Sequence, residues 1–214
     1  MKLLSINIGQ MTPLPGVKKV GQTGIFKTPA AGPVRVTSLG LEGDAIADVR
    51  HHGGPDQAVY VYGAPDYDWW AAELGQPPAP GTFGENLTVD GLESARLSVG
   101  DRLHLDEVVL EVTSPRIPCG TLAARMGDPT FVKRFRQAER PGVYCRVIRE
   151  GLAAAGEAVR LEAHAGPTIT VLAMFRDHYE PDWDEAKLRR HLAAPIAIRA
   201  REDAAERLAR LMGG

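Results

Sequence analysis

A short stretch of this sequence, Ser114-Pro115-Arg116-Ile117-Pro118-Cys119-Gly120, combines a thiol, a guanidinium and two prolines. The prolines restrict the backbone before Cys119, and a helix expected to begin near Thr121 places the thiol close to a helix N-terminus. That position, with Arg116 nearby, favours the thiolate, which is both a nucleophile and a soft metal ligand. The alternative is a packing cysteine, because cysteine is among the most buried residue types. Local sequence leaves the two interpretations balanced.

A second polar stretch, Asp48-Val49-Arg50-His51-His52-Gly53-Gly54-Pro55-Asp56, follows Gly40-Leu41-Glu42-Gly43-Asp44 and carries acids, an arginine and two histidines. Histidine and aspartate are common metal ligands. Adjacent histidines on a strand point to opposite faces, however, so both rarely bind one ion. Three interpretations stay open: a structural polar turn beside a site, cofactor contact through Arg50 or His52, and metal ligation.

Two further residues complete the candidates. Asn86, in Gly81-Thr82-Phe83-Gly84-Glu85-Asn86-Leu87-Thr88, offers two donors and an acceptor, although the segment is equally well explained as a turn that opens a strand. Cys145 lies in the middle of Val143-Tyr144-Cys145-Arg146-Val147-Ile148, a β-branched and aromatic run, and we interpret it as a packing residue.

The elements that must position these residues are mostly short strands separated by glycine and proline. The first strand should place Leu4, Ile6 and Ile8 on one face, and further strands are predicted at 34–37, 58–62, 103–105, 108–112 and 143–148. Many short strands with glycine turns indicate a sandwich or barrel. Two helices interrupt them, at 65–74, where Asp66 could act as cap, and at roughly 121–138.

At Gly166-Pro167 the sequence pattern changes from short apolar runs to helical segments. This break divides a β-rich domain (1–165) from a small three-helix domain (166–214). Helices are predicted at 170–179, 184–192 and 200–212, with Asp182 as the N-cap of the second. The apolar face of the third is predicted from Ala204, Ala205, Leu208, Leu211 and Met212. Helices this short should pack on one another, on the main domain or on a second copy of the chain, which leaves a homodimer open.

Bulk properties exclude some classes of protein. The 214 residues carry a net charge of −2, without the basic stripe that nucleic-acid binding requires. No apolar run reaches the ~20 residues of a membrane span, so we expect a cytoplasmic protein. Two cysteines cannot build a disulfide framework.

Taken together, the segments resemble the MOSC-domain family, named after the C-terminal domain of molybdenum cofactor sulfurase, and in particular its YiiM-like branch. Any one segment is weak evidence, but the ordered set over about residues 5–164 is specific. The matching stretches are Thr23-Gly24-Ile25-Phe26-Lys27, Gly40-Leu41-Glu42-Gly43-Asp44, His52-Gly53-Gly54-Pro55-Asp56, Phe83-Gly84-Glu85-Asn86-Leu87, Val99-Gly100-Asp101-Arg102-Leu103, Pro115-Arg116-Ile117-Pro118-Cys119 and Gly142-Val143-Tyr144-Cys145-Arg146-Val147.

The resemblance implies an α+β, mainly β fold: a MOSC-type β-barrel with a few helices, followed by the three-helix domain. It also implies a molybdenum cofactor (molybdopterin) whose metal is ligated by Cys119, the catalytic position. Lys27, Thr28 and Asn86 match family residues that bind this cofactor. Some reducing relatives carry an arginine where this chain has Gly84. In this chain, part of the contact with the phosphate group of the cofactor should therefore come from Arg50 or Arg116.

The activity implied is an enzymatic one, the reduction of small N-hydroxylated compounds such as N-hydroxylated purines or amidoximes. No flavin, haem or iron–sulfur motif is visible, so the electrons should come from a separate reductase. Two alternatives stay open: a sulfur carrier that uses a Cys119 persulfide in metal–sulfur centre assembly, and a binding module without catalysis.

Overall fold

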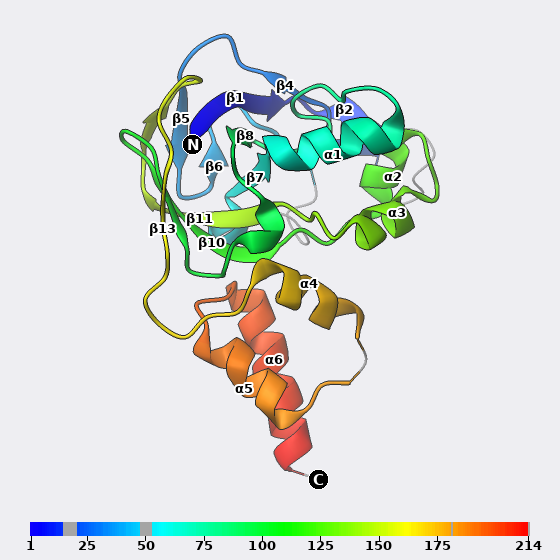
Figure 1. Cartoon of the computed structure of the whole chain (residues 1–214), viewed down its shortest axis with the longest axis vertical. Coiled ribbons are helices and arrows are strands. Elements are labelled where there is room, and N and C mark those ends of the chain that lie inside the picture. The colour runs from blue at the N-terminus through cyan, green and yellow to red at the C-terminus, as the bar shows by residue number, and fades with distance from the viewer. Residues whose placement is uncertain (15–20, 48–52, 181, 214) are drawn as a thin grey trace.

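The computed structural model of this chain describes residues 1–14, 21–47, 53–180 and 182–213. Figure 1 shows a strand-rich part with helices beside it, and further helices below. The strands are β1 (Lys2–Gly9), β2 (Thr12–Pro13), β3 (Gln22–Thr23), β4 (Lys27–Pro29), β5 (Val34–Thr37), β6 (Gly40–Leu41), β7 (Val59–Gly63), β8 (Leu87–Asp90), β9 (Arg102–His104), β10 (Val109–Pro115), β11 (Val143–Arg149), β12 (Gly151–Ala153) and β13 (Arg160–Glu162). The helices are α1 (Ala64–Leu74), α2 (Gly120–Met126), α3 (Phe131–Ala138), α4 (Val171–Tyr179), α5 (Glu185–Ala193) and α6 (Ile198–Met212), with 3-10 turns η1 (Pro55–Gln57) and η2 (Ser94–Arg96).

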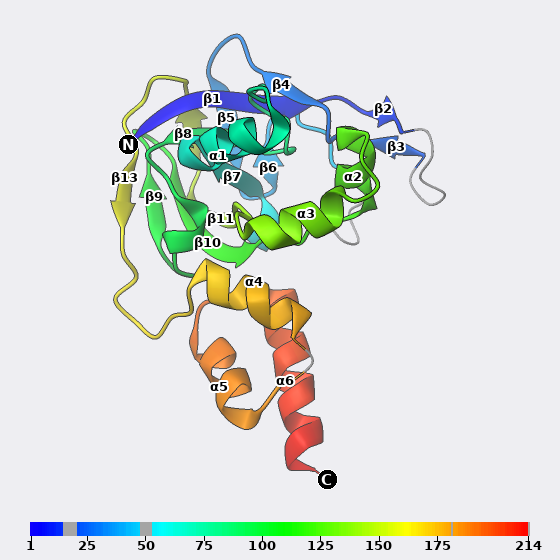
Figure 2. The ribbon, with the colours of Figure 1, turned by 45° about the vertical axis from the view of Figure 1, so that its right-hand side comes forward.

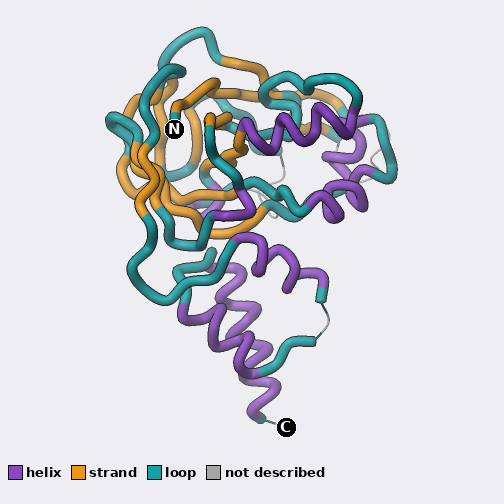
Figure 3. Tube along the Cα trace, in the orientation of Figure 1, coloured by secondary structure: helices purple, strands orange, loops and turns teal. Residues whose placement is uncertain are grey.

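The main sheet has eight strands in the order β13-β9-β10-β11-β7-β8-β1-β4. Its one parallel pair, β7 with β8, is joined through α1, because a parallel connection needs a crossover. The predicted α+β, mainly β fold is confirmed, as Figure 3 also shows.

The regular strand pairs of the described chain leave this sheet open, with β13 and β4 at its edges. A narrow seam nevertheless joins the start of β1 to the chain just before β13. Lys2 forms a bridge with Ala158, and the Leu3 amide donates to the Glu157 carbonyl at 2.9 Å. In Figure 2, β1 arches over the sheet from beside β13 toward β4. The predicted barrel is therefore a curved sheet with an irregular seam.

Strand β7 separates two cores. Val59 and Val61 are fully buried among the aliphatic side chains of the sheet interior. Tyr60 and Tyr62 alternate to the other face, where they join an aromatic cluster under the helices α1 to α3. This second cluster also contains Trp70, Phe83, Phe131 and Phe135. Burial on both faces explains why the Val-Tyr-Val-Tyr run has no polar alternation.

The face predicted for β1 is wrong in one position. Leu4 is 47% exposed, whereas Leu3 and Ile6 are buried. The cause is a bulge between Leu3 and Ser5, where the register against β8 shifts. One extra residue reverses the side-chain alternation on its N-terminal side.

The two helices predicted within the β-rich part also need correction. The single helix expected at 121–138 is divided into α2 and α3 by Gly127, whose φ of +64° ends α2 in a left-handed conformation. Asp66 is not the cap of α1; the N-cap is Gly63. Instead the buried Asp66 carboxylate accepts from Ser94 and pairs with Arg140 at 2.8 Å.

The three C-terminal helices are confirmed, with two corrections of detail. Asp184, not Asp182, caps α5, because its side chain accepts from the Lys187 amide at 2.7 Å. On α6 only Ala204 of the predicted apolar face is buried, while Leu211 and Met212 are more than half exposed. The helices attach to the sheet through a third apolar cluster that includes Val99, Ile169, Met174, Ala194 and Ile196. A boundary at residue 166 stays a prediction. No helix in the described ranges has the length and apolarity that a membrane span requires.

Candidate functional site

A cavity of about 110 Å³ lies where β4, the start of β7 and several loops meet. This volume holds several water molecules or a small group. Four residues predicted from the sequence line it together: Lys27, Asn86, Arg116 and Cys119. They come from segments far apart in the chain, so the fold has assembled them.

Cys119 occupies the junction between the end of β10 and the start of α2. It is the N-cap residue of α2, with extended backbone angles, and its side chain is half-buried. The predicted strand–loop–helix setting of this thiol is therefore confirmed. Cys145, by contrast, is completely buried in the sheet interior, as predicted, and burial raises the pKa of its thiol.

Arg116 lies behind the thiol and is almost fully buried. Its guanidinium stands 5.0 Å from the centre of the Tyr60 ring and donates to the Phe83 carbonyl. Burial alone would lower the pKa of Arg116, but the neighbouring Tyr60, Tyr144 and Cys119 raise it above its usual value. Arg116 thus stays cationic, and its Nε has no hydrogen-bond partner among the described residues.

A polar cluster, which we name the cavity cluster, consists of Lys27, Asp44 and Asn86. The Lys27 ammonium contacts both oxygens of the Asp44 carboxylate, and Asn86 donates to Asp44 at 2.8 Å. The amide of Gly9 also donates to Asp44, at 2.8 Å. Burial lowers the pKa of Lys27, and the pair with Asp44 opposes that shift. An incoming anion must therefore share Lys27 with Asp44.

The buried Glu85 side chain fixes the loop that carries Asn86 through hydrogen bonds. One Glu85 oxygen accepts from Tyr67 Oη at 2.5 Å and from the Gly81 amide at 2.7 Å, and burial raises the pKa of this acid. Gly84, at φ +76°, lies against the cavity; a Cβ there would come within 2.9 Å of Ile25 Cγ1. Backbone, not a side chain, therefore borders the cavity at this position.

Of the other predicted residues, the structure describes one, Thr28. Thr28 is exposed on β4 and does not line the cavity, because neighbouring residues of a strand face opposite sides. Arg50 and His52 lie outside the described residues. No group of three or more His, Cys, Asp or Glu side chains with metal-binding geometry occurs in the described ranges.

Sequence reasoning missed Asp44, Tyr60 and Tyr144, all of which line the cavity. Asp44 ends the motif Gly40-Leu41-Glu42-Gly43-Asp44, but its role as the shared acceptor of a lysine and an asparagine depends on long-range contacts. The two tyrosine rings are tilted against each other, with ring centres 5.1 Å apart. The sequence shows that both tyrosines lie in predicted strands, but it does not show which face of those strands borders a cavity.

A family model described as the MOSC domain matches residues 48–160. YflK of Bacillus subtilis (strain 168) is 39% identical over 177 residues, covering 83% of this chain and 80% of that protein. YiiM of Escherichia coli (strain K12) is 31% identical over 176 residues, covering 79% and 77%. A protein of Gibberella moniliformis named a reductase is 35% identical over 158 residues, but the match spans 28% of its length.

Solved structures give the same similarity. The crystal structure of YiiM from Geobacillus stearothermophilus superposes with a TM-score of 0.80 at 27% identity, covering 97% of this chain and 99% of that one. YiiM from Escherichia coli superposes with a TM-score of 0.75 at 26% identity, covering 100% and 94%. The likeness therefore includes the C-terminal helices.

Proposed function

Because this chain belongs to the MOSC-domain family, we propose that it is a molybdenum-cofactor-dependent oxidoreductase that reduces N-hydroxylated compounds, such as N-hydroxylated purines or amidoximes. The observation that carries the proposal is the meeting of Cys119, Arg116, Lys27 and Asn86 on one cavity. The likeness to a protein named a reductase supports a redox role.

The side chains of the cavity fit the metal end and the anionic end of the proposed group, while a volume of about 110 Å³ accommodates only part of it, so the rest would extend outside the cavity. A thiolate is a soft metal ligand, and Cys119 is the half-buried thiol, held between a proline and a helix N-terminus. Arg116 has a buried Nε without a partner among the described residues, so a donor remains for an anionic oxygen. Cys119 would hold the metal end of the cofactor, and Arg116 with Lys27 and Asn86 would hold its anionic end.

When bound, the cofactor supplies the two-electron chemistry, while the protein supplies ligation, orientation and electrostatics. Tyr60 and Tyr144 give the cavity an aromatic wall, against which a planar purine or amidoxime can stack. The Tyr60 hydroxyl is already bound to the Pro141 carbonyl at 2.9 Å, so the ring and not the hydroxyl serves this purpose. A separate reductase delivers the electrons, in a cytoplasmic setting that keeps both thiols reduced.

The test is Cys119→Ser in protein produced by a host that makes the molybdenum cofactor. Serine preserves the shape but replaces a soft ligand by a harder and much less acidic one, so reduction of an N-hydroxylated purine or amidoxime should fall by orders of magnitude. Molybdenum content and X-ray absorption at the metal edge are measured in parallel, with Cys145→Ala as control. A fully active Cys119→Ser variant, or an edge without a protein sulfur ligand, would contradict the proposal.

A further inference from the structure

Helix α6 begins without a cap of its own. The first amides of a helix need acceptors from outside, and the N-cap residue Ala197 has no side-chain oxygen to offer. The amide of Ile198 donates instead to a carboxylate oxygen of Asp56, at 2.6 Å, from a residue 142 positions earlier in the chain. A carboxylate is the favoured group at this end of a helix, because it also meets the positive end of the helix dipole.

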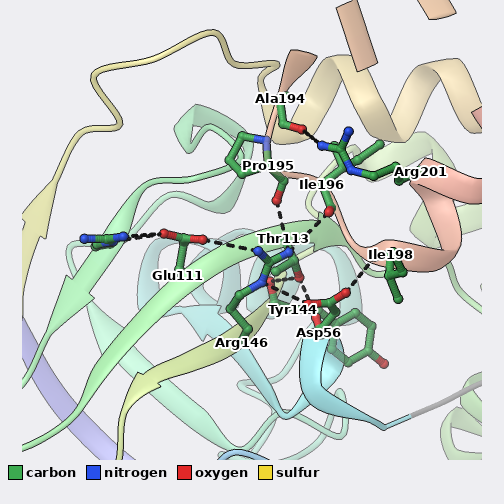
Figure 4. A network of polar contacts seen from close by, with 11 residues as sticks. Asp56, Glu111, Thr113, Tyr144, Arg146, Ala194, Pro195, Ile196, Ile198 and Arg201 are labelled. Atoms are coloured by element: carbon green, nitrogen blue, oxygen red, sulfur yellow. Dashed lines mark hydrogen bonds and ion pairs between the residues drawn. The ribbon is translucent and has the colours of Figure 1, made fainter. Parts of the chain in front are cut away.

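The same carboxylate is bound to the sheet. Its other oxygen lies 2.9 Å from Arg146 Nε, in an ion pair with β11. A terminal nitrogen of Arg146 donates to the carbonyls of Pro195 and Ile196, at 3.1 and 3.2 Å. Figure 4 shows Arg146 between Asp56 on one side and the segment that leads into α6 on the other. Asp56 and Arg146 therefore hold the start of α6 from two directions.

Backbone contacts complete the junction. The Thr113 hydroxyl lies 2.6 Å from the Asp56 carbonyl and 3.0 Å from the Tyr144 carbonyl, and its own carbonyl accepts from the Ala197 amide at 3.2 Å. Thr113 is fully buried, so these groups have little access to water. The junction thus joins η1, β10, β11 and α6.

Two segments of this junction continue directly into the cavity wall. Gln57, Ala58 and Tyr60, which follow Asp56, all line the cavity, and so does Tyr144. A displacement of Asp56 would move the backbone from which Gln57 enters the wall. The start of α6 and the cavity therefore share one support.

We propose that Asp56 is a positioning residue of the cavity, through which the C-terminal helices hold the wall formed by residues 57–60. The carboxylate acts as the N-cap of α6 and as the partner of Arg146, and in both roles it fixes η1. Only the identity of the ligand in the cavity rests on the function proposed above; the coupling itself concerns the unliganded chain.

The experiment uses Asp56→Ala in the full chain without cofactor. Alkylation of Cys119 by iodoacetamide reports the cavity, because Cys145 is completely buried. Hydrogen exchange of the Arg201 amide, which donates to the Ala197 carbonyl at 3.0 Å, reports the first turn of α6. Loss of a cap accelerates local opening by about fivefold or more, and we expect both rates to rise by such a factor. In cofactor-loaded protein, molybdenum content should fall as well.

The double variant Asp56→Ala/Ala197→Ser separates the two roles. A serine hydroxyl at position 197 can accept from the second or third amide of α6 and so stabilise its first turn. Exchange at Arg201 should therefore return toward the parent rate while alkylation of Cys119 stays fast. Parent-like alkylation in Asp56→Ala, or restoration of both rates by Ala197→Ser, would overturn the proposal, because Asp56 would then serve the helix alone.

Two further variants keep the test decisive. Asn retains the cap but not the charge, so Asp56→Asn should show a smaller effect on both rates, and it replaces Asp56→Ala if that variant does not fold. Glu111→Gln removes another carboxylate that Arg146 approaches, at 3.5 Å, away from the cavity lining, and should leave Cys119 unchanged. Equal effects of Glu111→Gln and Asp56→Ala would also overturn the proposal. A parent protein that binds no molybdenum would refute the proposed function and leave the alkylation result intact.

Discussion

Asp44 and Asp177, two of the buried acids among the described residues, each lie in a cluster of charged side chains, one in each part of the chain. The cavity cluster centres on Asp44, whose side chain is 6% exposed and which pairs with Lys27. A second cluster, which we name the helix cluster, centres on Asp177, at 7% exposure, between α4 and α5. Its other members are Lys187, Arg190 and His191, whose nitrogens lie 2.8 to 3.2 Å from the Asp177 carboxylate.

The clusters are alike in chemistry and differ in what borders them. In the helix cluster three donors converge on one acid, and none of its members lines the cavity. The cavity cluster lies beside Arg116, which has a buried nitrogen without a partner among the described residues, and beside a half-buried thiol. A buried ion pair is thus weak evidence for a site; surplus donors next to a cavity are much stronger evidence.

The largest effect that would test this contrast is expected at Lys27. Lys27→Met leaves the buried Asp44 carboxylate without its cation and should cost about 3–5 kcal/mol of unfolding free energy. Lys27→Met/Asp44→Asn removes both charges and should recover most of that loss in chemical denaturation. Cofactor retention should fall in both variants, by roughly ten- to a hundredfold, because a charge-assisted bond to the anionic group is lost. Parent-like retention by the double variant would remove Lys27 from the binding residues.

Asp177→Asn should have a smaller effect, about 2 kcal/mol, because Arg190 is half exposed and water replaces part of the lost interaction. Burial alone would raise the pKa of Asp177, but hydrogen bonds from His191 and Lys187 outweigh it and lower the pKa. A lowered pKa in the folded state stabilises the protein above the usual value of about 3.9, and this contribution disappears as the pH falls through the lowered pKa. The difference between parent and variant should therefore vanish in strong acid.

The control for Asp177 lies on the neighbouring helix. Glu185 forms an exposed pair with Arg189 on α5, at 2.7 Å, and Glu185→Gln should change stability by less than about 0.5 kcal/mol. Molybdenum content should stay at the parent level in both variants. Loss of the metal in Asp177→Asn would place the helix cluster in the site and end the distinction between the two clusters.

Local sequence predicted those strands and helices that a single pattern determines, such as side-chain alternation or a glycine–proline break. Alternating valines and tyrosines marked β7, and glycine and proline marked the change to helices after residue 166. The errors arose where a single residue changed the register or a helix end. The bulge after Leu3 shifts the register of β1 against β8, and the left-handed Gly127 ends α2, so that residues 127–130 separate it from α3.

Prediction of the site had a similar limit. Cys119, Arg116, Lys27 and Asn86 came from ordered motifs, and the fold brings them to one cavity. Asp44 escaped assignment because its partners lie 17 and 42 residues away, and no local pattern shows such a contact. The Asp56 carboxylate at the start of α6 escaped for the same reason.

The smallest effect at a buried position is expected at Cys145, and it tests which thiol belongs to the cavity. Cys145 lies opposite Val59 and Val112 in the sheet, and the fully buried thiol is kept neutral by its raised pKa. A neutral thiol is a poor nucleophile and a poor metal ligand. Cys145→Ala removes one buried sulfur and should cost about 1 kcal/mol in thermal or chemical unfolding, at the low end of core truncations. Molybdenum content and iodoacetamide uptake should match the parent, whereas Cys119→Ala should lose both with little change in stability. The opposite pattern, metal lost with Cys145 and kept without Cys119, would assign ligation to the sheet interior and not to the loop before α2.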